Sequence, residues 1–276
     1  MSLSQIGIDE CAIVLDDGAR TTLQRWGSEG PLLLCVHGMT SSRRSWERLA
    51  KRFDGTFRVA AYDQRGHGDS SGTVGPMALG RGVRDLEDVM AAIGEPVAAL
   101  VGHSWGGAVA IRTGLGSKVE RVAAIDPMVR QVDDAWYDEY LEELAESFTL
   151  SGRERDERTR EEYAEWAPED VEGKVHAVHA MTVAPIEGLR RENPPADWDL
   201  RDAIATYDRP LWLAFADPQQ SINTPETLDE VAANHSNFVE ITTFSGQGHN
   251  LHRTDFDTFA RDLRRFLEPT RHGPYR

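Results

Sequence analysis

The sequence predicts an α/β protein: a mostly parallel β-sheet flanked by helices, with a helical segment inserted between two of the strands. Short apolar runs alternate with helical patterns along most of the chain, which is typical of right-handed crossovers between parallel strands. Some runs, such as 31–38, are apolar at successive positions, as expected of strands that are buried on both faces. The strand pattern stops at about 130 and resumes at 209, and this gap marks the insertion.

Each element follows from its own pattern. The first two strands bracket "DDGA" and are expected to form a hairpin. The helix at 78–94 places Val83, Leu86 and Val89 at helical spacing and ends at Gly94. The expected strands are 11–15, 21–26, 31–38, 57–63, 96–102, 121–127, 209–217 and 238–244, and the expected core helices are 45–53, 78–94, 105–116, 224–234 and an amphipathic last helix within 251–269.

The domain division follows from this rhythm. We expect residues 1–129 and 209–276 to form one core, and residues 130–208 to form the helical insertion after the sixth strand. A chain of 276 residues is long enough to bury a sizeable core of this kind.

The charge of the chain excludes several classes of partner. The formal net charge is −16, which argues against nucleic acids and anionic membranes as partners. Residues 133–172 hold 16 Asp or Glu against 4 Arg, and this acidic excess is expected to face solvent. We therefore expect a small-molecule substrate, while the oligomeric state, monomer or homodimer, stays open.

The termini and cysteines point to the cytoplasm. No apolar run approaches the roughly 18 residues of a membrane span, and the N-terminus does not resemble a signal peptide. Cys11 and Cys35 both fall in predicted strands and are expected to be free, buried thiols in a reducing compartment.

The strongest functional signal is "GHSWG" at 102–106, which follows a predicted strand and precedes a predicted helix. In the pattern G-x-S-x-G the outer glycines permit a sharp turn that holds the serine hydroxyl exposed. The pattern predicts that Ser104 is a nucleophile, against the alternative of a glycine-rich crossover turn. The backbone N–H of Trp105 lies at a helix N-terminus, where negative charge is favoured.

Together with three other stretches, this motif resembles the α/β-hydrolase fold family. "VHGMTSS" (36–42) is similar to the family's His-Gly loop, "YDQRGHGDSSG" (62–72) to its D-x-R-G-x-G-x-S signature, and "GQGHN" (246–250) to its late histidine loop. The resemblance covers about 11–128 and 209–268. It implies an eight-stranded sheet and a helical cap inserted after strand six.

A serine hydroxyl needs a base, and the base needs a carboxylate to orient it. Among nine histidines, His249 lies where the family carries its base. The acid should lie between 104 and 249, and Asp217 and Asp126 both end predicted strands. The family's usual position after strand seven favours Asp217, although Ala214 replaces the usual glycine there. Asp126 stays as the alternative acid.

The remaining site residues are expected as follows. Acyl transfer needs two N–H donors for the oxyanion: Trp105 supplies one, and the resemblance assigns the other to Met39. His249 and His252 form an H-x-x-H pair without a third metal ligand, so neither a metal nor another cofactor is expected. His37 belongs to a loop motif and is expected to make structural hydrogen bonds, with a possible place in the pocket. Pocket aromatics are expected from the insertion: Trp136, Tyr137, Tyr140 and Trp166.

Several activities fit these residues. The leading interpretation is a carboxylesterase-like serine hydrolase that cleaves an ester, thioester or lactone of a small, hydrophobic acyl substrate through an acyl-enzyme. The alternatives are hydrolysis of a carbon–carbon bond in a β-diketone or ring-cleavage product, a prolyl aminopeptidase-like activity, and a ligand-binding protein on the same fold. Epoxide hydrolases and haloalkane dehalogenases, which carry Asp as the nucleophile, are disfavoured by Ser104.

Overall fold

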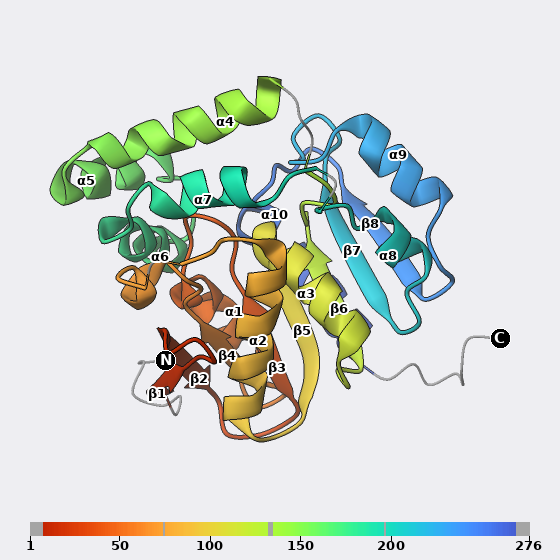
Figure 1. Cartoon of the computed structure of the whole chain (residues 1–276). Coiled ribbons are helices and arrows are strands. Elements are labelled where there is room, and N and C mark those ends of the chain that lie inside the picture. The colour runs from red at the N-terminus through yellow and green to blue at the C-terminus, as the bar shows by residue number, and fades with distance from the viewer. Residues whose placement is uncertain (1–7, 74, 132–134, 196, 269–276) are drawn as a thin grey trace.

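Eight strands form a single sheet in the computed structural model, which describes residues 8–73, 75–131, 135–195 and 197–268. The strands are β1 (Ile8–Val14), β2 (Arg20–Trp26), β3 (Leu32–Val36), β4 (Arg58–Tyr62), β5 (Val97–His103), β6 (Arg121–Ile125), β7 (Leu211–Ala216) and β8 (Val239–Phe244). Their order is β1-β2-β4-β3-β5-β6-β7-β8, and only the β1–β2 and β2–β4 pairs are antiparallel. The predicted mostly parallel, eight-stranded sheet is confirmed (Figure 1).

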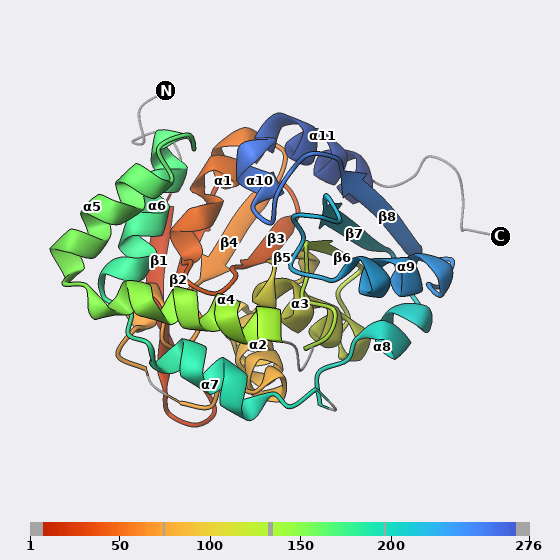
Figure 2. The same cartoon turned by 90° about the horizontal axis from the view of Figure 1, so that it is seen from above.

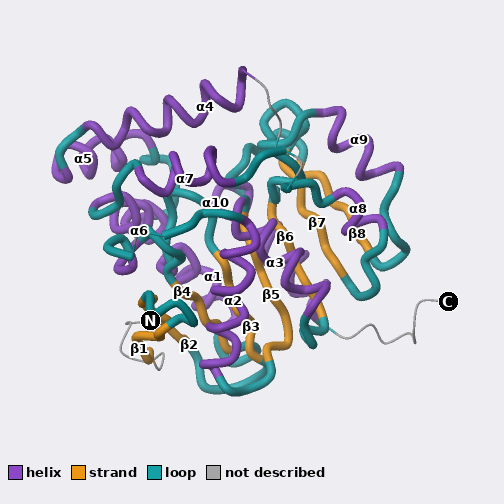
Figure 3. Tube along the Cα trace, viewed as in Figure 1, coloured by secondary structure: helices purple, strands orange, loops and turns teal. Residues whose placement is uncertain are grey.

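Helices cover both faces of the sheet. They are α1 (Glu47–Phe53), α2 (Leu79–Ile93), α3 (Trp105–Gly116), α4 (Ala135–Glu146), α5 (Gly152–Glu162), α6 (Pro168–His179), α7 (Ala184–Glu192), α8 (Arg201–Ala205), α9 (Pro225–Ala233), α10 (Leu251–Thr254) and α11 (Phe256–Leu267). Viewed from above, α1 and α11 lie on one side of the sheet and α2, α3 and α8 on the other (Figure 2). Strands and helices alternate along most of the chain, as the sequence pattern predicts (Figure 3).

Two hydrophobic cores result, because the central strands are apolar on both faces. One contains Phe53, Trp212 and Leu263, and joins the sheet to α1 and α11. The other contains Leu86 and Val109, and joins it to α2 and α3. The central parallel strands are thereby fixed from both sides, which makes their carboxyl ends a rigid platform for the loops that follow.

Five helices, α4 to α8, lie between β6 and β7, within the segment 130–208 where the insertion is expected. The two ends of this segment pair with each other: Leu200 N donates to Val129 O (2.8 Å), and Gln131 N donates to Trp198 O (3.1 Å). Helices α4 to α7 lie beyond the carboxyl ends of the strands (Figure 1). Helix α8 instead packs against α3 and α9, so the chain has returned to the core by Leu200.

The helices and the two cysteines can be compared with the expectations from the sequence. No helix among the described residues is both long and apolar enough to cross a bilayer. Both cysteines are free, and Cys35 is buried in β3 as expected. The expected burial of Cys11 is wrong: it is exposed, because it lies on β1, the edge strand of the sheet.

His37 joins the loop after β3 to the loop after β4. Its ring Nε2 accepts the backbone N–H of Gln64 (3.0 Å), so Nδ1 carries the proton and donates to Gly38 O (2.8 Å). The Gln64 side-chain amide donates in turn to His37 O. His37 is fully buried, and this burial lowers its pKa to about 4. The imidazole is therefore neutral at neutral pH, as its hydrogen bonds require.

This lowered pKa predicts a pH-dependent stability. Because the folded-state pKa of about 4 lies below the ordinary value of 6.5, the stabilisation by His37 is complete above pH 6.5 and is lost as the pH falls towards 4. The loss amounts to about 3 kcal/mol. Between pH 7 and pH 4, the free energy of unfolding of the wild type should therefore fall by that much more than that of His37→Gln, measured by urea denaturation. His235→Gln, at an exposed histidine, is the control and should keep the wild-type slope. Equal slopes for the wild type and His37→Gln would contradict the assignment.

Candidate active site

Ser104 occupies a sharp turn between β5 and α3. Its backbone has φ 54° and ψ −122°, a conformation that costs free energy for a residue with a Cβ atom. A Cβ atom on Gly102 would overlap the carbonyl of Gly106, and one on Gly106 would overlap the carbonyl of Val36. The two outer glycines of the motif are therefore required by close backbone approach. The turn is anchored where Ser104 N donates to Ile125 O on β6 (2.9 Å).

His249 and Asp126 form the central contact of the site. His249 lies in the loop between β8 and α10, and its Nδ1 lies 2.6 Å from Oδ2 of Asp126. Asp126 follows β6 and has no exposed surface. Its carboxylate also accepts from Ala216 N (3.1 Å), the Ser221 hydroxyl (2.7 Å) and Ile222 N (3.0 Å). These four donors fix the carboxylate in place, and so it orients the imidazole.

The expectation that Asp217 orients His249 is wrong. Asp217 follows β7, but its carboxylate accepts from Gly246 N (2.8 Å) and Gln219 N (3.1 Å). These backbone hydrogen bonds lower the pKa of Asp217. Its role is to tie the loop after β7 to the loop that carries His249. Asp126, the alternative acid, occupies the position against the ring because β6 lies next to β5, the strand that ends at the nucleophile turn.

His103 connects the nucleophile turn to the His249 loop. Its Nε2 lies 3.0 Å from the carbonyl oxygen of His249. Its ring lies 4.7 Å from the His249 ring and 4.3 Å from the buried His252 ring, centroid to centroid. Burial holds the pKa values of His103 and His252 well below their usual range. Both rings are therefore neutral: the His103 ring packs against His249, and the His252 ring packs against His103.

A cavity of about 690 Å³ contains Ser104 and His249 in its wall. Its floor comes from the core, through Met39, Thr40 and Ile222. The opposite wall of the cavity is formed by α4, α5 and α6 of the insertion. This wall contains more charged side chains than the sequence analysis predicts. The side chains from these helices and the turns beside them are Glu143, Leu144, Ser147, Arg155, Arg158, Thr159, Glu161, Glu162, Tyr163, Lys174 and Val178.

The residues predicted to line the pocket do not all line the cavity. Trp166 does not line the cavity. Its ring packs against that of Tyr163, which does, with the centroids 4.2 Å apart and the planes tilted by 42°. His37 lies buried beneath the cavity and makes the structural hydrogen bonds described above. The side chains of three further expected residues lie outside the described residues: Trp136, Tyr137 and Tyr140. Most described acidic residues of the insertion face solvent, but Asp156 is partly buried beside His179 (2.8 Å) and Asp170 is buried against Arg48 (3.0 Å).

The loop after β3 lies directly against the nucleophile turn. A Cβ atom on Gly38 would lie 3.0 Å from Cβ of Ser104. This close approach places Met39 at the cavity wall beside Ser104. The next residue, Thr40, has φ 54° and is held by Lys174, whose Nζ donates to Thr40 O (2.9 Å) and Thr40 Oγ1 (2.6 Å). The insertion therefore supports this loop directly.

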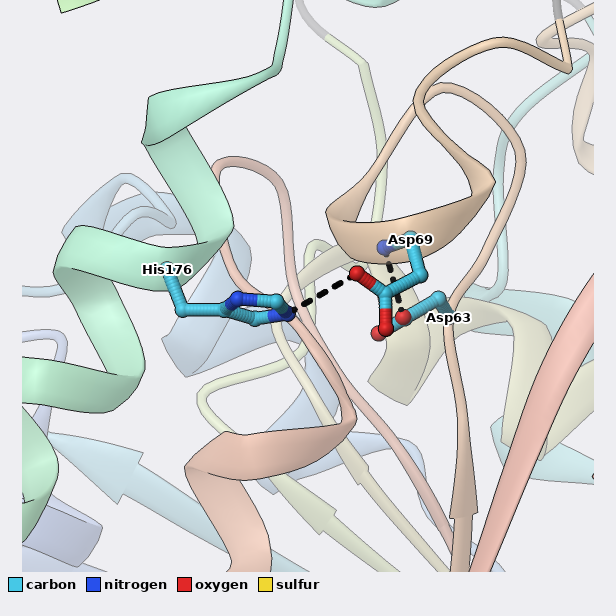
Figure 4. Close-up of side chains that lie close together, drawn as sticks. All are labelled: Asp63, Asp69 and His176. Atoms are coloured by element: carbon cyan, nitrogen blue, oxygen red, sulfur yellow. Dashed lines mark hydrogen bonds and ion pairs between the residues drawn. The ribbon is translucent and has the colours of Figure 1, made fainter. Parts of the chain in front are cut away.

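One group among the described residues has ligand atoms spaced for a metal ion: Asp63, Asp69 and His176 (Figure 4). His176 on α6 lies 3.5 Å from Asp69. The guanidinium of Arg43 already pairs with both Asp63 and Asp69. A cation site between these carboxylates is thus filled by Arg43, and the group serves as a contact between α6 and the core.

Comparison with known proteins agrees with this architecture. A family model described as "Alpha/beta hydrolase family" matches residues 33–262, which is most of the chain. The chain belongs to the alpha/beta hydrolase family. The fold expected from the four sequence motifs is therefore confirmed.

Individual alpha/beta hydrolases match over shorter stretches. Mouse (Mus musculus) "Epoxide hydrolase 4" is 32% identical over 100 residues, which cover 35% of this chain and 28% of that protein. "Lipase LipV" of Mycobacterium tuberculosis is 36% identical over 111 residues, 39% of this chain and 41% of that protein. These matches span less than half the length of either relative. Among solved structures, "E-2-(Acetamidomethylene)succinate Hydrolase" superimposes with a TM-score of 0.79 at 17% identity, over 95% of this chain and 100% of that one.

Sequence reasoning missed the charged side chains of the cavity. Lys174 is one of only three lysines in the printed sequence, and it lies in an acidic segment in which an isolated lysine attracts no attention. Arg155 lies in the run "RERDERTR", which reads as a solvated helical face. Their burial depends on how α5 packs against α6, and no local pattern encodes that packing.

Proposed function

We propose that this alpha/beta hydrolase is a serine hydrolase that cleaves an ester-like bond of a small acyl substrate. The observation that carries the proposal is the Asp126–His249 contact beside Ser104, which lies on a strained turn in the wall of the same cavity. A serine at this turn, rather than the aspartate of epoxide hydrolases, supports an acyl-enzyme route.

The proposed reaction uses the three residues in sequence. His249 accepts the proton of the Ser104 hydroxyl at Nε2 as the oxygen attacks the substrate carbonyl. Asp126 accepts the Nδ1–H of His249 and stabilises the imidazolium that forms. His249 then gives the proton to the leaving group, which leaves an acyl group on Ser104. Water, deprotonated by the same imidazole, attacks the acyl carbon. The Ser104–acyl bond then breaks, His249 returns the proton to Ser104 Oγ, and the acid product leaves.

The developing oxyanion needs N–H donors aimed at it. We assign this role to the backbone N–H groups of Met39 and Trp105, because the Gly38 loop lies against Ser104 and Trp105 opens α3. Loss of one such donor typically costs about 3 kcal/mol of transition-state stabilisation. The contacts of Lys174 with Thr40 support the geometry of this loop.

The insertion acts as a cap in this proposal. Helices α4 to α6 contribute one wall of the cavity, so they separate Ser104 from bulk water and select the acyl group. The wall combines apolar residues such as Leu144 and Val178 with charged ones. This composition gives only partial support to the hydrophobic acyl preference that the aromatic content of the insertion predicts.

The nucleophile can be tested by removing one oxygen atom. Ser104→Ala should lower the kcat for 4-nitrophenyl acetate by about 10⁴-fold or more and should abolish labelling by a fluorophosphonate probe, read by intact mass. Ser117→Ala, just beyond the opposite end of α3, is the matched control and should keep both activities. Substantial turnover by Ser104→Ala, with an unchanged circular dichroism spectrum, would refute the assignment.

The acid can be tested by comparing two isosteric changes. Asp126→Asn should lower kcat by roughly 10⁴-fold, because an amide neither fixes the tautomer of His249 nor stabilises its charged form. Asp217→Asn should lower kcat by less than about tenfold, since Asp217 only caps backbone N–H groups near the protein surface. Steady-state kinetics with 4-nitrophenyl acetate measure both values. The reverse ranking would return the catalytic role to the residue after β7.

A further inference from the structure

Three basic side chains around the cavity lack the carboxylate partners that other buried bases of this protein have. Elsewhere in the fold, buried arginines are paired: Arg43 pairs with Asp63, and Arg65 with Asp85 at 2.5 Å. Lys174 and Arg155 line the cavity, and Arg253 lies buried behind it against Ser41 and Ser45. None of the three makes an ion pair at salt-bridge distance with any described residue. The contrast is marked in a chain with 46 acidic residues and only 30 Lys and Arg.

The three bases donate hydrogen bonds to uncharged acceptors. Arg155 is 8% exposed; its two terminal nitrogens donate to the carbonyls of Phe148, Leu150, Val178 and Met181, and its Nε has no partner among the described residues. Arg253 is 5% exposed and donates to the hydroxyls of Ser41 and Ser45, both at 3.0 Å. Lys174 donates to two oxygen atoms of Thr40, which leaves its third N–H for another acceptor.

The charge of Arg253 acts on Lys174, while Asp156 lies near Arg155 and Asp170 lies near Arg253. Burial, with Arg253 as a secondary cause, lowers the pKa of Lys174 to about 7. Burial likewise lowers the pKa values of Arg155 and Arg253. Desolvated cations close together create a positive potential that an anionic group would relieve. Lys174 and Val178, whose carbonyl binds Arg155, are four residues apart on α6, which is about 6 Å of rise.

The acidic side chains of the cavity lie at its exposed rim. Glu143, Glu161 and Glu162 line the cavity, but each is exposed to solvent. Charges exposed to water are screened, whereas the half-buried Lys174 and the buried Arg155 act in a lower dielectric. The interior of the cavity therefore favours an anion even though the protein as a whole is acidic.

We propose that the cavity binds a substrate whose acyl part carries a carboxylate, which Lys174 receives while Arg155 and Arg253 supply supporting positive charge. This inference rests on the proposed function for the reacting end of the substrate: the scissile carbonyl lies at Ser104 and the free carboxylate points to α6. The substrate class is a monoester, or a similar mono-acyl derivative, of a short dicarboxylic acid.

Matched substrates test the inference. The wild type should hydrolyse mono-4-nitrophenyl glutarate with a kcat/KM about tenfold or more above that for 4-nitrophenyl pentanoate, which has the same acyl length without the carboxylate. In Lys174→Met this preference should fall towards one, whatever the change in the rate with the neutral ester, because Lys174 also supports the loop at Thr40. Lys174→Arg should retain the preference. Arg160→Gln, which removes an exposed charge from α5 outside the cavity, is the control and should behave as wild type.

Three kinetic results would overturn the inference. In one, the wild type shows no preference for the anionic ester. In another, Lys174→Met lowers the rates of both esters equally, so that Lys174 only supports the Thr40 loop. In the third, an amino-acid 4-nitroanilide is the best substrate, so that the rim carboxylates bind an amine.

A binding measurement separates this inference from the proposed reaction. Glutarate should bind to Ser104→Ala in calorimetry, about tenfold more weakly when Lys174→Met is added, and glutaramide should not bind. If glutarate binds in this way but no ester is hydrolysed, the proposed reaction fails and the anion site stands. If the neutral ester is hydrolysed and glutarate does not bind, the anion site fails and the reaction stands.

Discussion

The carboxylate of Asp126 is the point at which the separate parts of this site meet. It lies at the end of β6, next to the strand that ends at Ser104, and it binds His249 from the loop after β8. It also binds Ser221 and Ile222 in the loop after β7. One buried charge therefore fixes the loops of three adjacent strands. Such a charge is tolerated only because four donors surround it, which makes the arrangement specific as well as stable.

The insertion is organised by charge around this centre. Its acidic residues face solvent almost throughout the described part, while Lys174 and Arg155 point from α6 and α5 towards the cavity. The same helices are joined to the core by opposite charges, as in the pair Arg48–Asp170. The net acidity of the sequence therefore conceals a positive interior, and the sign of the overall charge is a poor guide to the ligand.

The strands and the crossover helices could be predicted, because each leaves a local periodic pattern. The turn at Ser104 could be predicted because close backbone approach demands glycine at 102 and 106. Which of Asp126 and Asp217 binds His249 could not be predicted. Both residues follow parallel strands, and only the tertiary arrangement decides which carboxylate faces the imidazole. The cavity wall could not be predicted either. Whether Lys174, Arg155 or Trp166 faces the cavity depends on helix–helix packing. Trp166 packs against Tyr163 instead of lining the cavity for this reason.

The central claim is that the Nδ1–H of His249 is held by Asp126. Proton NMR of protein with ¹⁵N-labelled histidine observes this hydrogen directly, because a ring N–H donated to a buried carboxylate gives a strongly downfield, slowly exchanging resonance. The account predicts that this resonance is present in the wild type, persists in Asp217→Asn and disappears in Asp126→Asn, while the folded spectrum is otherwise retained. Persistence of the resonance in Asp126→Asn, with its loss in Asp217→Asn, would contradict the account.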